Sequence, residues 1–184
     1  MSRIHVLHEN PDWLPPLAAA LDRSGACWED WFLVERAIDL SAAPPEGVFY
    51  NRMSASSHTR GHRYAAELTS VTLAWLEQYG RRVVNGSAAL DLEISKARQY
   101  SALARAGVAT PRTLPVVGKD KLVAAARQAF GDRRFLLKPN RGGKGLGVRL
   151  VQDIDDLRAT LPALAGEPTA DDVWLVQEYC PSPD

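Results

Sequence analysis

The sequence of 184 residues has little cysteine and lacks any long apolar run. Its two cysteines, Cys27 and Cys180, stand far apart and outside any Cys-x-x-Cys motif, which argues against a disulfide framework. No stretch approaches the roughly 20 apolar residues of a membrane span. The first residues also lack the apolar core of a signal peptide. We therefore expect a soluble protein in the reducing cytoplasm, with no membrane partner.

An excess of charge of either sign is also missing. Lys plus Arg total 22, and Asp plus Glu total 22. Proteins that bind nucleic acid or anionic membranes usually carry a basic excess, so the sequence gives no support for such partners. Apolar residues make up 46% of the chain and charged residues 24%, which favours a packed core over disorder. An oligomer is compatible with this composition.

The first half of the chain has the pattern of a small α/β domain. Apolar periodicity predicts short strands at 4–7, 31–34, 48–51 and 82–84, and helices at 13–23 and 63–79. The order strand, helix, strand, strand, helix, strand indicates a small sheet with helices packed on it. We place the domain boundary near residues 88–92, which gives a first domain of residues 1–90 and a second of residues 91–184.

The second half begins with a helix, predicted for residues 95–106, in which Ser95 is the N-cap and Gly107 the stop signal. The following pattern predicts an extended segment ending near Val117, helices at 122–130 and from Ile154, and strands at 135–138, 148–151 and 173–179. Pro162 is expected to shorten the last helix.

The strongest chemical signal is the segment FLLKPNRGGKGLGVRLV, residues 135–151. Four glycines, Gly142, Gly143, Gly145 and Gly147, occupy the turn between two strands. Glycine lets backbone N–H groups approach an anion closely, and such loops often hold phosphates. Lys138 precedes the loop. A plain hairpin with a flexible turn is the alternative, but the added positive charge of Arg141 and Lys144 favours a phosphate site.

Three familiar glycine motifs do not fit this loop. A Walker A motif needs Ser or Thr after its lysine and then a helix, whereas Lys144 is followed by Gly145 and a strand. The dinucleotide-binding fingerprint also opens a helix, and its spacing is not met. In protein kinases the phosphate-binding lysine follows the loop, whereas Lys138 comes before it. The order strand, lysine, glycine-rich turn, strand indicates another nucleotide fold.

A second chemical signal is a strand that ends in polar residues. The segment WLVQEYC, residues 174–180, runs from an apolar strand into Gln177 and Glu178, where polar atoms could match adenine. A strand end that turns polar without binding a ligand is the alternative.

A cluster of side-chain donors follows the predicted strand 48–51 and precedes a predicted helix, which is a natural place for an anion. Its members are Arg52, Ser54, His58, Thr59, Arg60, His62 and Arg63. A solvated loop is the alternative. His58 and His62 have the i, i+4 spacing of a metal pair, but no third ligand is near in the sequence.

Taken together, three segments resemble the ATP-grasp superfamily, within it the branch of glutathione synthetases and RimK-type glutamate ligases. They are SKARQYSALARAGVATP from Ser95, FLLKPNRGGKGLGV from Phe135 and LVQEYC from Leu175. Similar ligases have one lysine that opens the linker helix and a second on the strand before the glycine loop, matched here by Lys96 and Lys138. Arg52 and Asn85 match an arginine and an asparagine of the family's first domain.

The resemblance implies a Rossmann-like pre-ATP-grasp domain, a linker helix and the first α+β lobe of an ATP-grasp domain. It further implies ATP and magnesium as cofactors, with small-molecule or peptide carboxylate and amine substrates joined through an acylphosphate, possibly an amino acid added to a peptide or protein. The residues expected to bind nucleotide are Lys96, Lys138, Gly142, Gly143, Lys144, Gly145, Leu146, Gly147, Gln177, Glu178, Tyr179 and Cys180. Those expected to bind the acceptor substrate are Arg52, Ser54, His58, Arg60 and Arg63.

Similar ligases carry their magnesium ligands and a catalytic arginine after the adenine segment. We therefore expect these groups beyond Asp184, no metal site within this chain, and no activity from the chain alone, as from a truncated enzyme. Lys138 is expected to be an exposed lysine that contributes little to folding. A non-catalytic half-domain that binds nucleotide or a partner is one alternative, and a kinase or carboxylase of the same superfamily is another.

Overall fold

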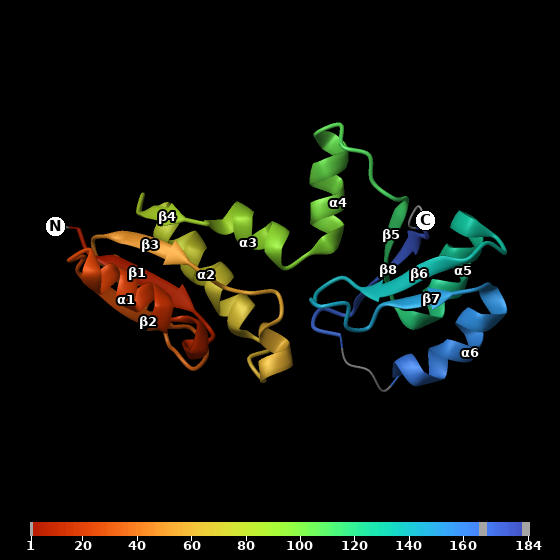
Figure 1. The fold of residues 1–184 in the computed structure, drawn as a ribbon, viewed down its shortest axis with the longest axis horizontal. Coiled ribbons are helices and arrows are strands. Elements are labelled where there is room, and N and C mark those ends of the chain that lie inside the picture. Colours follow the sequence, from red (N-terminus) through yellow and green to blue (C-terminus); the bar gives the residue numbers. More distant parts are fainter. Residues whose placement is uncertain (1, 166–168, 182–184) are drawn as a thin grey trace. The chain divides into compact units, whose positions relative to one another are not determined.

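A computed structural model describes residues 2–165 and 169–181, with only the backbone of Ala165. The chain forms two compact units, Met1–Ile94 and Ser95–Asp184 (Figure 1). Each unit has its own sheet and its own hydrophobic core. In the described part of the chain, no helix is long and apolar enough to cross a membrane.

The first unit is built on a four-stranded parallel sheet with strand order β2-β1-β3-β4, as the α/β pattern predicted. Its central strand β1 has buried neighbours Val6 and Leu7, which point to opposite faces, so both faces of the sheet are covered. Its elements are β1 (Ile4–His8), η1 (Pro11–Trp13), α1 (Pro15–Arg23), β2 (Trp28–Phe32), β3 (Val48–Asn51), η2 (Ser57–Arg60), α2 (Ala65–Gln78), β4 (Arg82–Val84) and α3 (Ser87–Glu93).

The strand order changes direction at β1. The chain passes from β1 to β2 on one side, and then crosses to β3 on the other side of β1. In open parallel sheets, ligands bind in the crevice that such a reversal leaves at the carboxyl ends of the strands. In this unit the rule predicts a crevice where β1 ends at His8 and β3 ends at Asn51.

Two features of this unit differ from the sequence prediction. Strand β2 covers Trp28–Phe32, not 31–34, because Glu29 and Asp30 hide the strand pattern. These acids lie in the edge strand and face His5 and His8 of β1. Helix α3, Ser87–Glu93, was not predicted at all. Only Leu90 of this helix is buried, so no apolar stripe marks it.

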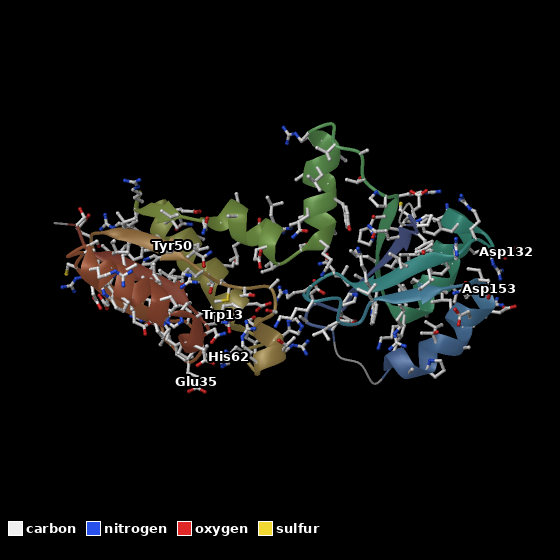
Figure 2. The ribbon with its side chains drawn as sticks, in the orientation of Figure 1. Trp13, Glu35, Tyr50, His62, Asp132 and Asp153 are labelled. Carbon is white, nitrogen blue, oxygen red and sulfur yellow. The ribbon has the colours of Figure 1, made fainter. Side chains whose placement is uncertain are left out.

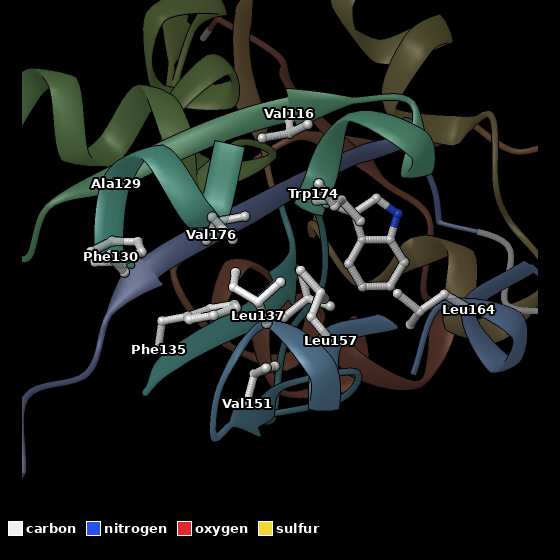
Figure 3. Close-up of a cluster of buried hydrophobic side chains, with 13 residues drawn as sticks. Val116, Ala129, Phe130, Phe135, Leu137, Val151, Leu157, Leu164, Trp174 and Val176 are labelled. Carbon is white, nitrogen blue, oxygen red and sulfur yellow. The ribbon is translucent and has the colours of Figure 1, made fainter. Parts of the chain in front are cut away.

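The second unit contains a four-stranded antiparallel sheet with strand order β5-β8-β6-β7. Helices α5 and α6 cover one of its faces, and the core between them includes Phe135, Leu137 and Trp174 (Figure 3). The elements are α4 (Lys96–Arg105), β5 (Thr113–Val117), α5 (Lys119–Phe130), β6 (Phe135–Pro139), β7 (Arg149–Val151), α6 (Ile154–Ala165) and β8 (Val173–Glu178).

Alternation along the strands sends polar side chains to the opposite face of this sheet. In β6, Leu137 points into the core, so its neighbour Lys138 points away from it. In β8, Val176 points into the core and Gln177 points away. Lys138 and Gln177 therefore share the face that α5 and α6 leave free.

Helix α6 begins with a side-chain cap that the sequence analysis did not predict. Asp153 Oδ1 accepts hydrogen bonds from the N–H groups of Asp155 at 3.0 Å and Asp156 at 2.9 Å. Asp156 Oδ2 accepts in return from the N–H of Gln152 at 2.8 Å. This reciprocal arrangement satisfies backbone donors that the first turn of a helix leaves free.

The cap predicts that Asp153→Ala lowers the free energy of unfolding of the second unit by about 1 kcal/mol. Asp155→Ala is the matched control, because Asp155 offers only an exposed ion pair with Arg158 and should cost almost nothing. Urea denaturation of both variants measures the difference, and equal losses would contradict the assignment of the cap.

Candidate functional site

The glycine-rich loop connects β6 to β7, and its backbone explains several of its glycines. Gly145 and Gly147 have φ angles of 73° and 71°, in the left-handed region that favours glycine. A Cβ atom on Gly147 would also lie 3.0 Å from Pro139. Lys144 adopts φ 56° despite its side chain. The turn is closed by hydrogen bonds from Leu146 N to Gly143 O and from Val148 N to Gly145 O.

Lys138 precedes this loop and is buried, not exposed as the sequence had suggested. Only 8% of the residue is accessible to solvent. Its ammonium donates hydrogen bonds to Gln177 Oε1 at 2.6 Å and to the Tyr100 hydroxyl at 2.9 Å. The prediction of an exposed lysine was wrong because it ignored α4, whose Tyr100 lies over this face of the sheet.

Lys96 is the first residue of α4, directly after the N-cap Ser95, whose hydroxyl accepts from the N–H of Arg98. The Lys96 ammonium donates to Gly142 O at 2.8 Å and to Asn140 O at 3.2 Å. The structure therefore brings this predicted nucleotide ligand to the beginning of the glycine loop.

Asn140 was not predicted from the sequence, yet it joins α4 to the loop. Its Oδ1 accepts from the N–H of Ala97 at 2.9 Å and from the Ser95 hydroxyl at 3.1 Å. Its Nδ2 donates to Asp171 at 2.6 Å. An asparagine at the end of a buried strand, just before the glycines, was the signal available in the sequence.

Tyr100 is the second residue that sequence reasoning missed. It lies four positions after Lys96 on α4, a spacing that places both side chains on one face of the helix. Burial by itself would raise the pKa of Tyr100. The hydrogen bonds with Lys138 and Gln177, and the charges of Lys138 and Lys96, outweigh burial and bring the pKa below the ordinary tyrosine value.

The predicted adenine segment lies at the end of β8. The buried side chain of Gln177 is engaged by Lys138 and by the Thr113 hydroxyl, which accepts from Nε2 at 2.6 Å. Glu178 pairs with the backbone of Arg112 through both its N–H and its carboxylate. A pocket of about 290 Å³ adjoins this strand end, and it is lined by Phe130, Arg133, Arg134, Glu178 and Tyr179. Cys180 is exposed.

In the first unit, a pocket of about 450 Å³ lies at the carboxyl end of β3, where the reversal of strand order predicts a crevice. Arg52 and Ser54, two of the predicted acceptor ligands, line it, and the Arg52 guanidinium donates to Trp13 O at 3.0 Å. The complete lining is Trp13, Tyr50, Asn51, Arg52, Met53, Ser54, Asn85, Ala89, Leu90 and Glu93. Figure 2 labels Trp13 and Tyr50 among the side chains.

The other predicted acceptor ligands do not line this pocket. Arg60 pairs through two nitrogens with the carboxylate of Glu9, a residue that is 1% exposed. His62 Nδ1 lies 3.0 Å from Oε2 of the same carboxylate. His58 Nδ1 instead lies 3.1 Å from the carbonyl oxygen of Ala55. Arg63 is exposed, with its guanidinium over the ring of Tyr64.

The anion that Arg60 holds is therefore a carboxylate of the protein itself. Sequence reasoning missed Glu9, although its place directly after a buried strand was a usable signal. His62 Nδ1 faces the Glu9 carboxylate, and His58 Nδ1 faces the carbonyl oxygen of Ala55. In the ranges 2–165 and 169–181, no three acidic, histidine or cysteine side chains gather as a metal site would require.

Comparison with known proteins identifies solved structures that have a similar fold. No family model and no curated protein matches the chain. Among solved structures it is similar to a RimK domain ATP-grasp protein from Sphaerobacter thermophilus, with a TM-score of 0.68, 21% identity, and coverage of 98% of this chain and 65% of that one. It is also similar to D-alanyl-alanine synthetase A from Vibrio cholerae, with a TM-score of 0.66 and 13% identity over 98% and 60% of the two chains.

A third similar structure is the ATP-grasp ligase PsnB in complex with precursor peptide PsnA2 and AMPPNP. Its TM-score is 0.57 at 19% identity, over 98% of this chain and 65% of that one. The chain thus has the fold of the N-terminal portion of ATP-grasp ligases, and it spans less than two thirds of the length of these three chains. The resemblance seen in the sequence motifs is confirmed at the level of the fold.

The ion pairs of Glu9 predict a large loss of stability in Glu9→Gln. The amide leaves the partly buried Arg60 cation, whose side chain is 25% exposed, without its buried counter-charge, which should cost about 3 kcal/mol. Glu46→Gln is the matched control, because Glu46 pairs with Arg81 but its side chain is 86% exposed. Thermal and urea unfolding compare the two variants, and similar stabilities would show that Glu9 does not hold this unit together.

Proposed function

We propose that this protein is the ATP-binding part of an ATP-dependent ligase that joins a carboxylate to an amine. The observation that carries the proposal is the convergence of Lys96 and Lys138 on the β6–β7 hairpin. Lys96 contacts the first residues of the glycine loop, and Lys138 is buried on the strand directly before that loop. Two ammonium groups beside a loop of exposed backbone suit a chain of phosphates.

The reaction proceeds in two steps. The carboxylate oxygen attacks the γ-phosphorus of ATP, the bond to the β-phosphate oxygen breaks, and an acylphosphate and ADP form. The amine nitrogen then attacks the acyl carbon, phosphate leaves, the nitrogen loses a proton, and an amide results. Lys138 and Lys96 place positive charge where negative charge moves during phosphoryl transfer, which lowers the barrier to the first step.

The glycine loop supports these lysines through its backbone. The loop residues 144–148 are exposed, so their N–H groups can meet phosphate oxygens from the solvent side. Magnesium stays a prediction from the family resemblance. When bound, it would neutralise part of the phosphate charge.

For the adenine we propose the end of β8, where Glu178 and Tyr179 line a pocket with Arg134. The Arg134 guanidinium carbon lies over the Tyr179 ring, 4.6 Å from its centre, so a cation and an aromatic face already meet there. The side chain of Gln177 is engaged elsewhere, so its role is to orient Lys138 and not to contact the base.

For the acceptor substrate we propose the pocket of the first unit. Arg52 supplies a cation for a carboxylate, and Glu93, which also lines the pocket, supplies an anion for an amine. The similarity to PsnB, a ligase solved with a precursor peptide, favours an amino acid or a peptide as one substrate. Arg60 supports this pocket indirectly, because its guanidinium lies over the Trp13 ring that lines it.

The nucleotide site predicts that Lys138→Met weakens ATP binding by about thirtyfold, because a charged hydrogen bond to phosphate contributes about 2 kcal/mol. A modest loss of stability is also expected, since Gln177 and Tyr100 lose their buried partner. Lys121→Met is the control, with a side chain that is 72% exposed. Calorimetric titration with ATP makes the measurement, and unchanged affinity in Lys138→Met would remove its phosphate role.

The acceptor pocket predicts that Arg52→Ala raises the apparent KM for the acceptor about tenfold and leaves the KM for ATP almost unchanged. ATP consumption with a panel of amino acids and short peptides supplies both values. Arg23→Ala, an exposed arginine at the end of α1, should alter neither. If only the KM for ATP rose, Arg52 would belong to the nucleotide site, and its assignment to the acceptor pocket would be wrong.

A further inference from the structure

The ammonium of Lys138 lies within a closed group of three side chains. Besides its hydrogen bonds to Gln177 and Tyr100, its nitrogen lies 5.0 Å from the centre of the Tyr100 ring. The Tyr100 hydroxyl in turn donates to Gln177 Oε1 at a longer 3.4 Å. Tyr100 therefore contacts Lys138 through both its oxygen and its aromatic face.

The other partner of Lys138 is fixed in one orientation. Gln177 Nε2 donates to the Thr113 hydroxyl at 2.6 Å, and that hydroxyl donates to Pro111 O at 2.9 Å. This chain of donors turns the Oε1 atom of Gln177 toward Lys138. The Gln177 amide therefore cannot rotate to follow the lysine. The contact with Tyr100 determines the position of the Lys138 ammonium around Gln177 Oε1.

The number of donors on the lysine matters as well. An ammonium has three N–H bonds. Two of them are directed to Gln177 and Tyr100, which leaves the third for a ligand on the face of the sheet that α5 and α6 do not cover. If the Tyr100 oxygen were removed, the Lys138 ammonium could rotate about its bond to the side chain. Its third N–H would then no longer point toward the ligand.

We propose that Tyr100 is a positioning residue for nucleotide binding, which aims the Lys138 ammonium at the phosphates through its hydroxyl and its ring. The inference rests on the proposed function and adds a residue to it. It also connects the two lysines, because Tyr100 and Lys96 lie on one face of α4, and Lys96 is bonded to the loop carbonyls. A shift of α4 would move both contacts together.

The protonation state of Tyr100 supplies a readout that a purely structural role would not change. The charged groups facing its hydroxyl are Lys138 from β6 and Lys96 from its own helix, while β8 presents the neutral Gln177. Because the pKa of Tyr100 is below the ordinary tyrosine value, its phenolate forms at a lower pH than that of a free tyrosine. The phenolate pairs with Lys138 and cancels the charge that attracts phosphate.

The test is calorimetric titration of the protein with ATP from pH 7 to pH 10, for wild type, Tyr100→Phe and Tyr100→Leu. At pH 7, Tyr100→Phe is expected to bind ATP about tenfold more weakly, and Tyr100→Leu more weakly still because the ring contact is lost too. As the pH rises, wild type should lose affinity before Tyr100→Phe does. Tyr79→Phe, at an exposed tyrosine of the first unit, is the control.

Circular dichroism melting verifies that the variants are folded, and Tyr100→Phe keeps the shape of the side chain. Wild-type affinity and an unchanged pH profile in Tyr100→Phe, beside impaired binding in Lys138→Met, would overturn the role of Tyr100 and leave the nucleotide site intact. Unimpaired binding in Lys138→Met would instead overturn the proposed function and this inference with it.

Discussion

The burial of the Lys138 ammonium is the constraint on which the second unit depends. A charge removed from water is costly unless hydrogen bonds replace the water. Gln177 supplies one of these bonds from β8 and Tyr100 supplies another from α4, so the lysine joins a strand, its neighbour and a helix. Asn140 repeats this connection two residues later, because its side chain binds the first turn of α4 and also Asp171. The glycine loop begins directly after these two anchored residues.

The first unit also contains a buried charged group, but this one is negative. The carboxylate of Glu9 is buried directly after the central strand, where Arg60 compensates its charge and the His62 ring contacts the same carboxylate. The same arginine packs over Trp13, whose backbone carbonyl accepts from Arg52. A buried acid thereby orders the wall of a pocket that opens at the carboxyl end of β3. Each unit therefore places its candidate site beside a buried charge, and within each unit the partners of that charge come from segments distant in sequence.

Sequence reasoning predicted the fold well where apolar residues repeat regularly. The alternation of Phe135 and Leu137, and the glycines that follow, identified the β6–β7 hairpin, and Ser95 was recognised as a helix cap. It failed where charged residues or a short element hide the apolar pattern. The edge strand with Glu29 and Asp30 is an example of the first case, and helix α3 of the second. Of the side chains that gather at the candidate sites, it had named both lysines but neither Tyr100 nor Glu9. Their importance comes from contacts across 38 and 51 positions of the chain, which no local pattern records.

We expect the Lys138 ammonium, held by Tyr100 and Gln177, to face the phosphates of a bound nucleotide. A crystal structure of the protein with ADP is the decisive measurement. It should place a phosphate oxygen within hydrogen-bonding distance, about 2.7–3.2 Å, of Lys138 Nζ, with the glycine-loop N–H groups beside the same phosphates. ADP bound elsewhere, or bound here with Lys138 making no contact to phosphate, would contradict it.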